Sequence, residues 1–231
     1  MSFTKHIPNT ITCCNLICGC IATGFAFKGE YALAFYFIIA GAVFDFFDGF
    51  AARLLHVSSA IGKELDSLAD DITFGFAPAT IVFSLLGDFL PENYRWAAYG
   101  AFLIAAFSAL RLAKFNLDER QSLGFIGLPT PANALFWGAL ALKITTLDFP
   151  SSYNIYIAAA IAIGVLFSSW ILVSEVPMFA LKFKQYGWKG NELRYSFIAV
   201  SALMLALLGW GGFSAIVVLY VILSVLTQRK A

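Results

Sequence analysis

Four aspartates at regular spacing are the residues of this sequence best suited to chemistry. Asp45 and Asp48 are three residues apart, and Asp66 and Asp70 are four apart, so each pair shares one face of a helix. A carboxylate costs about 2.5–3.5 kcal/mol at the centre of a membrane-spanning helix, so acids in apolar segments need a compensating role. Clustered carboxylates repel one another unless they bind protons or cations, and oxygen ligands favour Mg²⁺, Mn²⁺ or Ca²⁺ over zinc. The pattern predicts a divalent-cation site.

Small residues continue the helical stripes that carry the acids. They are Gly49, Ala52 and Gly62. Their size leaves room for a bulky, phosphate-bearing ligand to approach the helix backbone. In the alternative interpretation, the acids extend toward water at the helix ends or pair with Arg53 and Lys63. Four acids on two coherent faces, with small residues on the same stripes, favour the ligand site.

The elements that position these acids are predicted to be membrane-spanning helices. Hydrophobic residues make up 60% of the 231 residues and charged residues 13%, whereas a soluble domain has roughly a quarter charged residues. The mean hydropathy is +0.80, and the apolar runs are close to the ~20 residues that cross a bilayer. We therefore expect an all-α polytopic membrane protein, a bundle of about eight transmembrane helices. The predicted segments are 8–27, 31–55, 65–87, 94–115, 130–147, 153–175, 193–209 and 212–228.

The basic residues predict the orientation of this bundle. If the N-terminus is cytoplasmic, twelve basic residues lie on that side and three on the other, the bias typical of cytoplasmic loops. Both termini and the acid cluster are therefore predicted at the cytoplasmic face. The larger set is Lys5, Arg53, Lys63, Arg111, Lys114, Arg120, Lys182, Lys184, Lys189, Arg194, Arg229 and Lys230, and the smaller set is Lys28, Arg95 and Lys143.

The first apolar run is expected to be a retained membrane span and not a cleaved signal peptide. Pro8 and Asn9 interrupt its start, and no clear small-x-small cleavage site follows.

The tryptophans are expected to face lipid or the membrane interface. They include Trp137, Trp170, Trp188 and Trp210.

The acid-rich run resembles the signature of the CDP-alcohol phosphotransferase family, D-x2-D-G-x2-A-R-x8-G-x3-D-x3-D. Every defined position matches: Asp45, Asp48, Gly49, Ala52, Arg53, Gly62, Asp66 and Asp70. The flanking sequence is similar to the phosphatidylserine synthase branch of that family. It opens with P-N-x2-T-x2-N at Pro8, reads G-x-E-L-D-S-L-A-D from Gly62, and continues with R-L-A-K-F-N from Arg111 and G-L-P-T-P from Gly127. Lys114 stands where arginine is usual, and the likeness covers roughly residues 7 to 140.

The resemblance implies an enzyme that displaces CMP from CDP-diacylglycerol and joins the phosphatidyl group to the hydroxyl of L-serine. It implies that Asp45, Asp48, Asp66 and Asp70 hold one or two divalent cations, Mg²⁺ or Mn²⁺, with Asp70 also the general base. The substrate-binding positions expected from it are Thr12, Asn15, Gly49, Ala52, Arg53, Gly62, Lys63 and Arg111.

Arg111 has two interpretations. It is expected either to clamp the serine carboxylate or the lipid phosphate, or to reach lipid phosphates from a helix end. The substrate role of Lys63 is equally open.

The family also implies a domain organisation and partners. We expect one membrane domain over 1–231, with a catalytic core at about 7–175 and a C-terminal helical hairpin at about 193–228. The protein is expected in the cytoplasmic membrane, as a homodimer without nucleic acid. Glycerol 3-phosphate and inositol phosphate are the rival acceptors. A cation-coupled transporter is the rival from another class, but the acids gather at one face and no internal repeat is visible.

Overall fold

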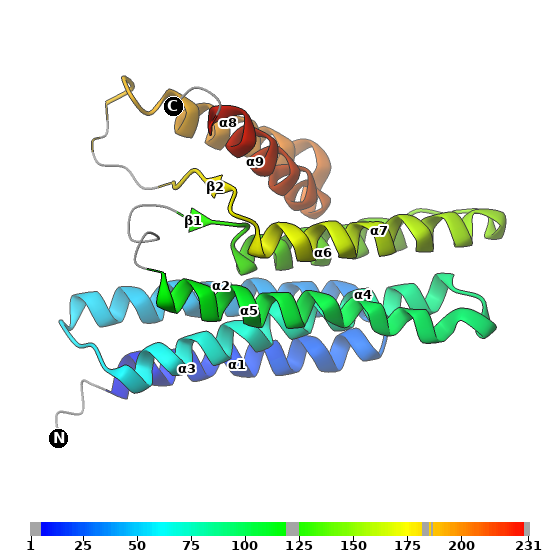
Figure 1. The fold of residues 1–231 in the computed structure, drawn as a ribbon, viewed down its shortest axis with the longest axis horizontal. Coiled ribbons are helices and arrows are strands. Elements are labelled where there is room, and N and C mark those ends of the chain that lie inside the picture. Colours follow the sequence, from blue (N-terminus) through cyan, green and yellow to red (C-terminus); the bar gives the residue numbers. More distant parts are fainter. Residues whose placement is uncertain (1–5, 119–124, 182–184, 186, 229–231) are drawn as a thin grey trace.

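The computed structural model describes residues 6–118, 125–181, 185 and 187–228, and helices dominate them (Figure 1). The predicted all-α polytopic class is confirmed. The N-terminal helices contain most of the family signature and of its flanking segments. They are α1 (His6–Phe27), α2 (Tyr31–Leu54), α3 (Ala60–Asp70), the π-helix η2 (Asp71–Phe76), α4 (Ala77–Phe89), the 3₁₀ helix η3 (Glu92–Phe102) and α5 (Leu103–Leu117).

The second half of the chain adds four longer helices and two very short strands. The elements are β1 (Phe125–Ile126), α6 (Thr130–Thr145), η5 (Ser151–Tyr153), α7 (Asn154–Val173), β2 (Pro177–Met178), α8 (Glu192–Leu208), η6 (Gly209–Gly211) and α9 (Gly212–Gln228). Strands β1 and β2 pair antiparallel, with Phe125 opposite Met178. This pairing joins the end of α7 to the segment before α6.

Six helical runs in the described part of the chain are long and apolar enough to cross a bilayer. They are His6–Phe27, Tyr31–Leu54, Ala60–Phe89, Glu92–Leu117, Ser151–Val173 and Glu192–Thr227. The last run contains α8 and α9, which pack against each other as a hairpin, and α6 has 16 residues. The chain is therefore a multi-pass membrane protein, and the count of eight crossings stays a prediction.

The connections alternate between the two ends of the bundle. The start of α1 and the α2–α3 connection lie at one end in Figure 1, and the α4–η3 connection lies at the other. The cytoplasmic location of both termini stays a prediction. Some basic residues behind that prediction lie outside the described residues: Lys5, Arg120, Lys182, Lys184, Arg229 and Lys230.

Helices α1 and α2 approach η2 very closely, through glycines that face Thr73. A Cβ atom on Gly19 would lie 2.5 Å from Thr73 Oγ1 and 2.8 Å from its Cα, and one on Gly41 would lie 2.5 Å from Thr73 Cγ2. The Thr73 hydroxyl donates a hydrogen bond to the Asn15 carbonyl at 3.0 Å. Small residues commonly allow such approaches between membrane helices. The glycines therefore set the spacing of the three helices.

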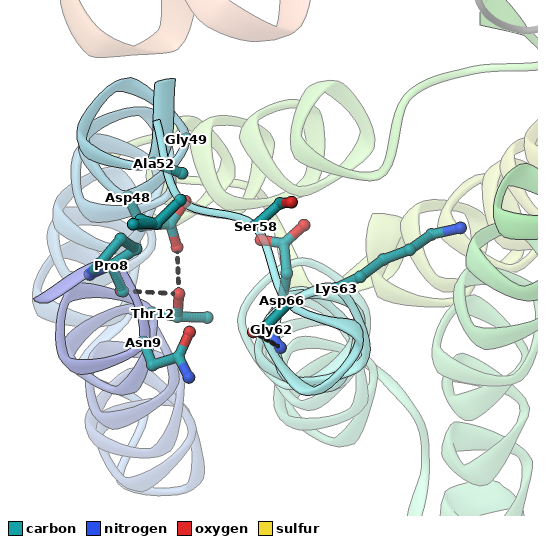
Figure 2. A pocket seen from close by; sticks show the side chains of 12 residues that line it. Pro8, Asn9, Thr12, Asp48, Gly49, Ala52, Ser58, Gly62, Lys63 and Asp66 are labelled. Carbon is teal, nitrogen blue, oxygen red and sulfur yellow. Dashed lines mark hydrogen bonds between the residues drawn. The ribbon is translucent and has the colours of Figure 1, made fainter. Parts of the chain in front are cut away.

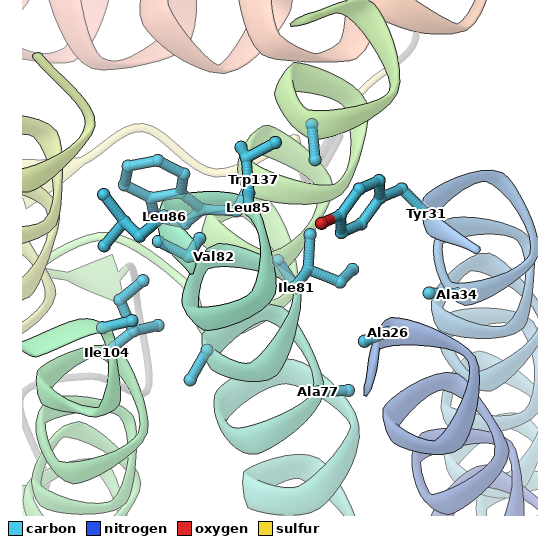
Figure 3. Close-up of a cluster of buried hydrophobic side chains, with 14 of the residues drawn as sticks. Ala26, Tyr31, Ala34, Ala77, Ile81, Val82, Leu85, Leu86, Ile104 and Trp137 are labelled. Atoms are coloured by element: carbon cyan, nitrogen blue, oxygen red, sulfur yellow. The ribbon is translucent and has the colours of Figure 1, made fainter. Parts of the chain in front are cut away.

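The main hydrophobic core lies beyond this contact, away from the acids (Figure 3). Ile81 and Leu85 of α4 are fully buried there beside Trp137 of α6, which is 1% exposed. The indole of Trp137 donates to Ser168 Oγ at 3.1 Å. The expectation that Trp137 faces lipid or the interface is therefore wrong, because helices α6 and α7 pack with the indole between them.

The close contact at Thr73 generates a prediction about stability. Gly19→Ala forces a methyl group against backbone atoms of η2, so it should destabilise the protein by ~1–3 kcal/mol, the usual cost of overpacking. The midpoint of thermal unfolding in detergent should fall by several degrees. Gly24→Ala is the matched control in the same helix, because nothing lies within 4 Å of its Cβ position. Equal midpoints for the two variants would contradict a tight contact at Gly19.

Candidate active site

Three carboxylates converge where α2 and α3 face each other. One oxygen from each of Asp45, Asp48 and Asp66 lies within 4.8 Å of the others. Asp48 is buried, and Asp45 and Asp66 are half-buried. From Asp48 to the end of α2 at Leu54 is about 9 Å at 1.5 Å per helical residue. The cluster therefore lies inside the bundle but near the end where α2 connects to α3.

Helix α1 orients two of the four signature acids. Thr12 Oγ1 donates to Asp48 Oδ2 at 2.6 Å (Figure 2), and Asn15 Nδ2 donates to Asp70 Oδ1 at 3.1 Å. Thr12 and Asn15 are buried and one helical turn apart. Asp70 lies outside the close group of three and is the last residue of α3. The opening P-N-x2-T-x2-N motif thus provides side chains that hold the acids.

A cavity of 280 Å³ opens beside the acids. Its walls come from the start of α1, the end of α2 and the start of α3, and Asp48 and Asp66 point toward it (Figure 2). Gly49, Ala52 and Gly62 line it, so no long side chain projects from these three positions. Small lining residues allow a ligand to approach the backbone.

The α2–α3 connection is held at the mouth of this cavity. Ser59 caps α3 by accepting a hydrogen bond from Gly62 N at 2.9 Å, as expected for a serine at a helix start. This cap lets α3 begin at Ala60, five residues before the predicted start of the span at 65. Asn9, Ser58 and Ser59 also line the cavity, and none of them was predicted as a site residue. The P-N opening was the available signal for Asn9.

Helix α3 is hydrogen-bonded to α5. Lys63 Nζ donates to the Asn116 carbonyl at 3.1 Å, and Asn116 Nδ2 donates to Ser67 Oγ at 2.8 Å. The Lys63 side chain lines the cavity with its stem and leads away from Asp48 and Asp66 (Figure 2). The R-L-A-K-F-N segment of α5 and the K-E-L-D-S segment of α3 are therefore hydrogen-bonded to each other.

The residues present fit a divalent cation. In the described part of the chain, no lysine or arginine forms an ion pair with Asp45, Asp48 or Asp66. Asp66 Oδ1 is buried and has no hydrogen-bond partner among the described residues. Buried carboxylate oxygens normally have a partner. Three converging oxygens without protein cations therefore match the ligand preference of Mg²⁺ or Mn²⁺.

Arg111 lies away from the first cavity and lines a second one. Its side chain is 6% exposed, and its guanidinium lies 5.1 Å from the centre of the Phe115 ring. It interacts electrostatically with Asp70 and with Tyr220 of α9. The Tyr220 hydroxyl donates to the Phe179 carbonyl at 3.0 Å. Sequence reasoning missed Tyr220, because no motif marks the C-terminal third of the chain.

The other predicted positions are distributed as follows. Arg53 is exposed, and its Nη1 lies 3.5 Å from the Cβ position of Gly49. Thr12 lines the first cavity, whereas Asn15 lies behind it and contacts Asp70. The structure thus places the predicted positions around the first cavity and the neighbouring acids, except Arg111, which lines the second cavity.

Comparison with known proteins identifies the family. The sequence model of the family described as CDP-alcohol phosphatidyltransferase matches residues 5–179. The chain belongs to the CDP-alcohol phosphatidyltransferase family. All four acids, both cavities, and helices α1 to α7 lie in the region that matches this family. Helices α8 and α9 lie beyond it.

Curated relatives carry the name CDP-diacylglycerol–serine O-phosphatidyltransferase. The chain is 35% identical to the Bacillus subtilis (strain 168) protein over 175 residues, which is 74% of this chain and 89% of that protein. It is 33% identical to the Methanocaldococcus jannaschii protein over 171 residues, 74% of this chain and 75% of the relative. A Helicobacter pylori (strain 26695) protein is 31% identical over 169 residues, 70% of this chain and 69% of the relative.

Proposed function

We propose that this member of the CDP-alcohol phosphatidyltransferase family transfers the phosphatidyl group of CDP-diacylglycerol to the hydroxyl of L-serine and releases CMP. The observation that carries the proposal is the group of three carboxylates within 4.8 Å beside a cavity at the helix ends. The relatives named as serine transferases support the choice of acceptor. The site supports the phosphoryl chemistry, since a diphosphate needs its charge neutralised before an oxygen nucleophile attacks.

The first cavity is proposed to hold the CDP end of the lipid. Gly49, Ala52 and Gly62 let the diphosphate approach the backbone, and Arg53 stands at the edge as a cation for it. Thr12 both lines this cavity and holds Asp48. Because the cavity opens near a helix end, the acyl chains can stay in hydrocarbon while the headgroup meets water.

Asp45, Asp48 and Asp66 are the proposed metal ligands, with Mg²⁺ or Mn²⁺ as the ion and Asp70 at the edge of the group. An ion held there would supply positive charge to the diphosphate and to the departing CMP. Thr12 and Asn15 fix the orientation of Asp48 and Asp70, as partners of metal ligands commonly do.

Asp70 is the proposed general base. It accepts the proton of the serine hydroxyl while the serine oxygen forms a bond to the phosphatidyl phosphorus. The bond from that phosphorus to the CMP oxygen breaks, and CMP leaves with the electron pair. Asn15 donates a hydrogen bond to one oxygen of Asp70. This contact also fixes the orientation of the other oxygen of the carboxylate.

The setting of the site completes the proposal. We place the protein in the cytoplasmic membrane, with the acids facing the cytoplasm, as the bias of basic residues predicts. Residues 1–231 form one membrane domain with a catalytic core at about 7–175 and a C-terminal hairpin at about 193–228. A homodimer, with CDP-diacylglycerol and serine as substrates, is the proposed working form.

The direct test is an assay of the purified chain with CDP-diacylglycerol, Mn²⁺ or Mg²⁺ and isotopically labelled acceptors. We expect CMP release coupled to labelled phosphatidylserine, and loss of activity in excess chelator that the metal restores. Glycerol 3-phosphate and inositol phosphate should give much slower transfer. Full activity in excess chelator would contradict the metal proposal, and preferred transfer to glycerol 3-phosphate would reassign the acceptor.

The assignment of Asp70 predicts a separation of turnover from binding. Asp70→Asn should lower turnover by at least ~100-fold, the lower range for loss of a general base, and leave the affinity for CDP-diacylglycerol largely unchanged. Glu92→Gln, at an exposed position on η3 outside the quoted motifs, is the control and should leave both quantities near those of the wild type. Parallel losses of turnover and affinity in Asp70→Asn would make Asp70 a metal ligand and not the base.

A further inference from the structure

A second cavity, of 400 Å³, lies where α5 and α7 end beside β1. Its charged lining consists of two cations and two carboxylates: Arg111, Lys114, Asp118 and Glu175. They come from two segments that are far apart in the sequence. Lys114 Nζ donates to the Val173 carbonyl at 3.4 Å, so the cation is held against the end of α7.

The backbone around this cavity is fixed. Gly127 has a φ of +75°, and a Cβ on it would collide with the Leu172 carbonyl oxygen. Gly127 N donates to the Val176 carbonyl at 2.9 Å, and Leu128 N donates to the Ile171 carbonyl at 3.1 Å. The G-L-P segment is thus bonded to the end of α7 and to the chain just beyond Glu175. The cavity wall that carries Glu175 is therefore preformed.

We infer that this cavity is the acceptor site and that it recognises serine as a zwitterion, with the carboxylate at Arg111 and Lys114 and the ammonium at Glu175 and Asp118. The inference rests on the proposed transfer to serine. A lining of mixed sign matches a ligand that carries both charges. In addition, α5 ends at Leu117 and α7 at Val173, and helix C-termini favour positive charge.

The position of Arg111 connects this cavity to the chemistry. On α5, Arg111 lies between Ser108, which faces Gly75 of η2, and Asn116, which donates to Ser67 of α3. This places Arg111 beside the α3–η2 junction where Asp70 lies, so a carboxylate bound at the guanidinium is close to the base. The serine hydroxyl is separated from its carboxylate by only two carbons. Anchoring the carboxylate at Arg111 therefore directs the hydroxyl toward Asp70.

The same lining disfavours the rival acceptors. Glycerol 3-phosphate and inositol phosphate carry a dianionic phosphate and no cation. In this cavity they would meet the carboxylates of Asp118 and Glu175 and two helix C-termini without a compensating ammonium group. The recognition of ammonium is thus proposed as the source of acceptor choice.

The test uses Glu175→Gln and Lys114→Met in the full-length protein, with two competitors of serine. Ethanolamine lacks the carboxylate, and 3-hydroxypropanoate lacks the ammonium. Glu175→Gln should raise the KM for serine and the inhibition constant of ethanolamine by about tenfold each, because a charged hydrogen-bond partner is lost. It should leave the inhibition constant of 3-hydroxypropanoate within about twofold. Lys114→Met should reverse the pattern, weakening serine and 3-hydroxypropanoate and sparing ethanolamine.

The controls separate this inference from the proposed function. Glu92→Gln removes a carboxylate from η3, at the opposite end of the bundle, and should change none of the constants. If the wild type transfers to serine but Glu175→Gln weakens all three ligands alike, the zwitterion site is wrong and the proposed function stands. Inhibition by inorganic phosphate that competes with serine and is unaffected by Glu175→Gln would also overturn it, in favour of an anion site. If the wild type does not use serine, both fail.

Discussion

The contact of two glycine-bearing helices with Thr73 is the constraint on which the site depends. Gly19, Gly41 and Thr73 each lie one helical turn from a residue of the site: Asn15, Asp45 and Asp70 respectively. A larger residue at the contact would separate the helices and, one turn further along, the acids. The spacing that lets three carboxylates meet is therefore set by small residues that carry no chemistry. The main hydrophobic core, on the other side of this contact, holds α4 and α6 in place.

Electrostatics makes such a cluster unstable without a cation. Two unit charges at 4.8 Å, the largest separation among the three ligand oxygens, repel each other by about 3.5 kcal/mol at an effective dielectric constant of about 20. Thr12 and Asn15 donate single hydrogen bonds to Asp48 and Asp70, which compensate only part of this repulsion. A divalent ion would compensate the rest. The cluster thus lowers the stability of the ion-free protein, but its oxygens are already in position to bind an ion.

The sequence predicted the acids well because their spacing is local. Asp45 and Asp48 share a face of any helix, and the hydropathy of the flanking runs predicts a helix at these positions. Other features depend on segments distant in the chain: the burial of Trp137, the interaction of Tyr220 with Arg111, and the presence of Glu175 and Lys114 in one cavity lining. Hydropathy does not distinguish a tryptophan that faces lipid from one that faces another helix. For the same reason the motif near Gly127 was visible, but its bonding to the end of α7 was not.

The proposed metal site depends on this helix contact, which brings Asp45, Asp48 and Asp66 together. The most direct measurement is a crystal structure of the protein grown with Mn²⁺ and recorded at the manganese absorption edge. We expect an anomalous peak among these three carboxylates, with oxygen ligands at about 2.0–2.6 Å, the range of hard divalent cations. A well-occupied peak elsewhere, with Asp66 hydrogen-bonded to a protein cation, would contradict it.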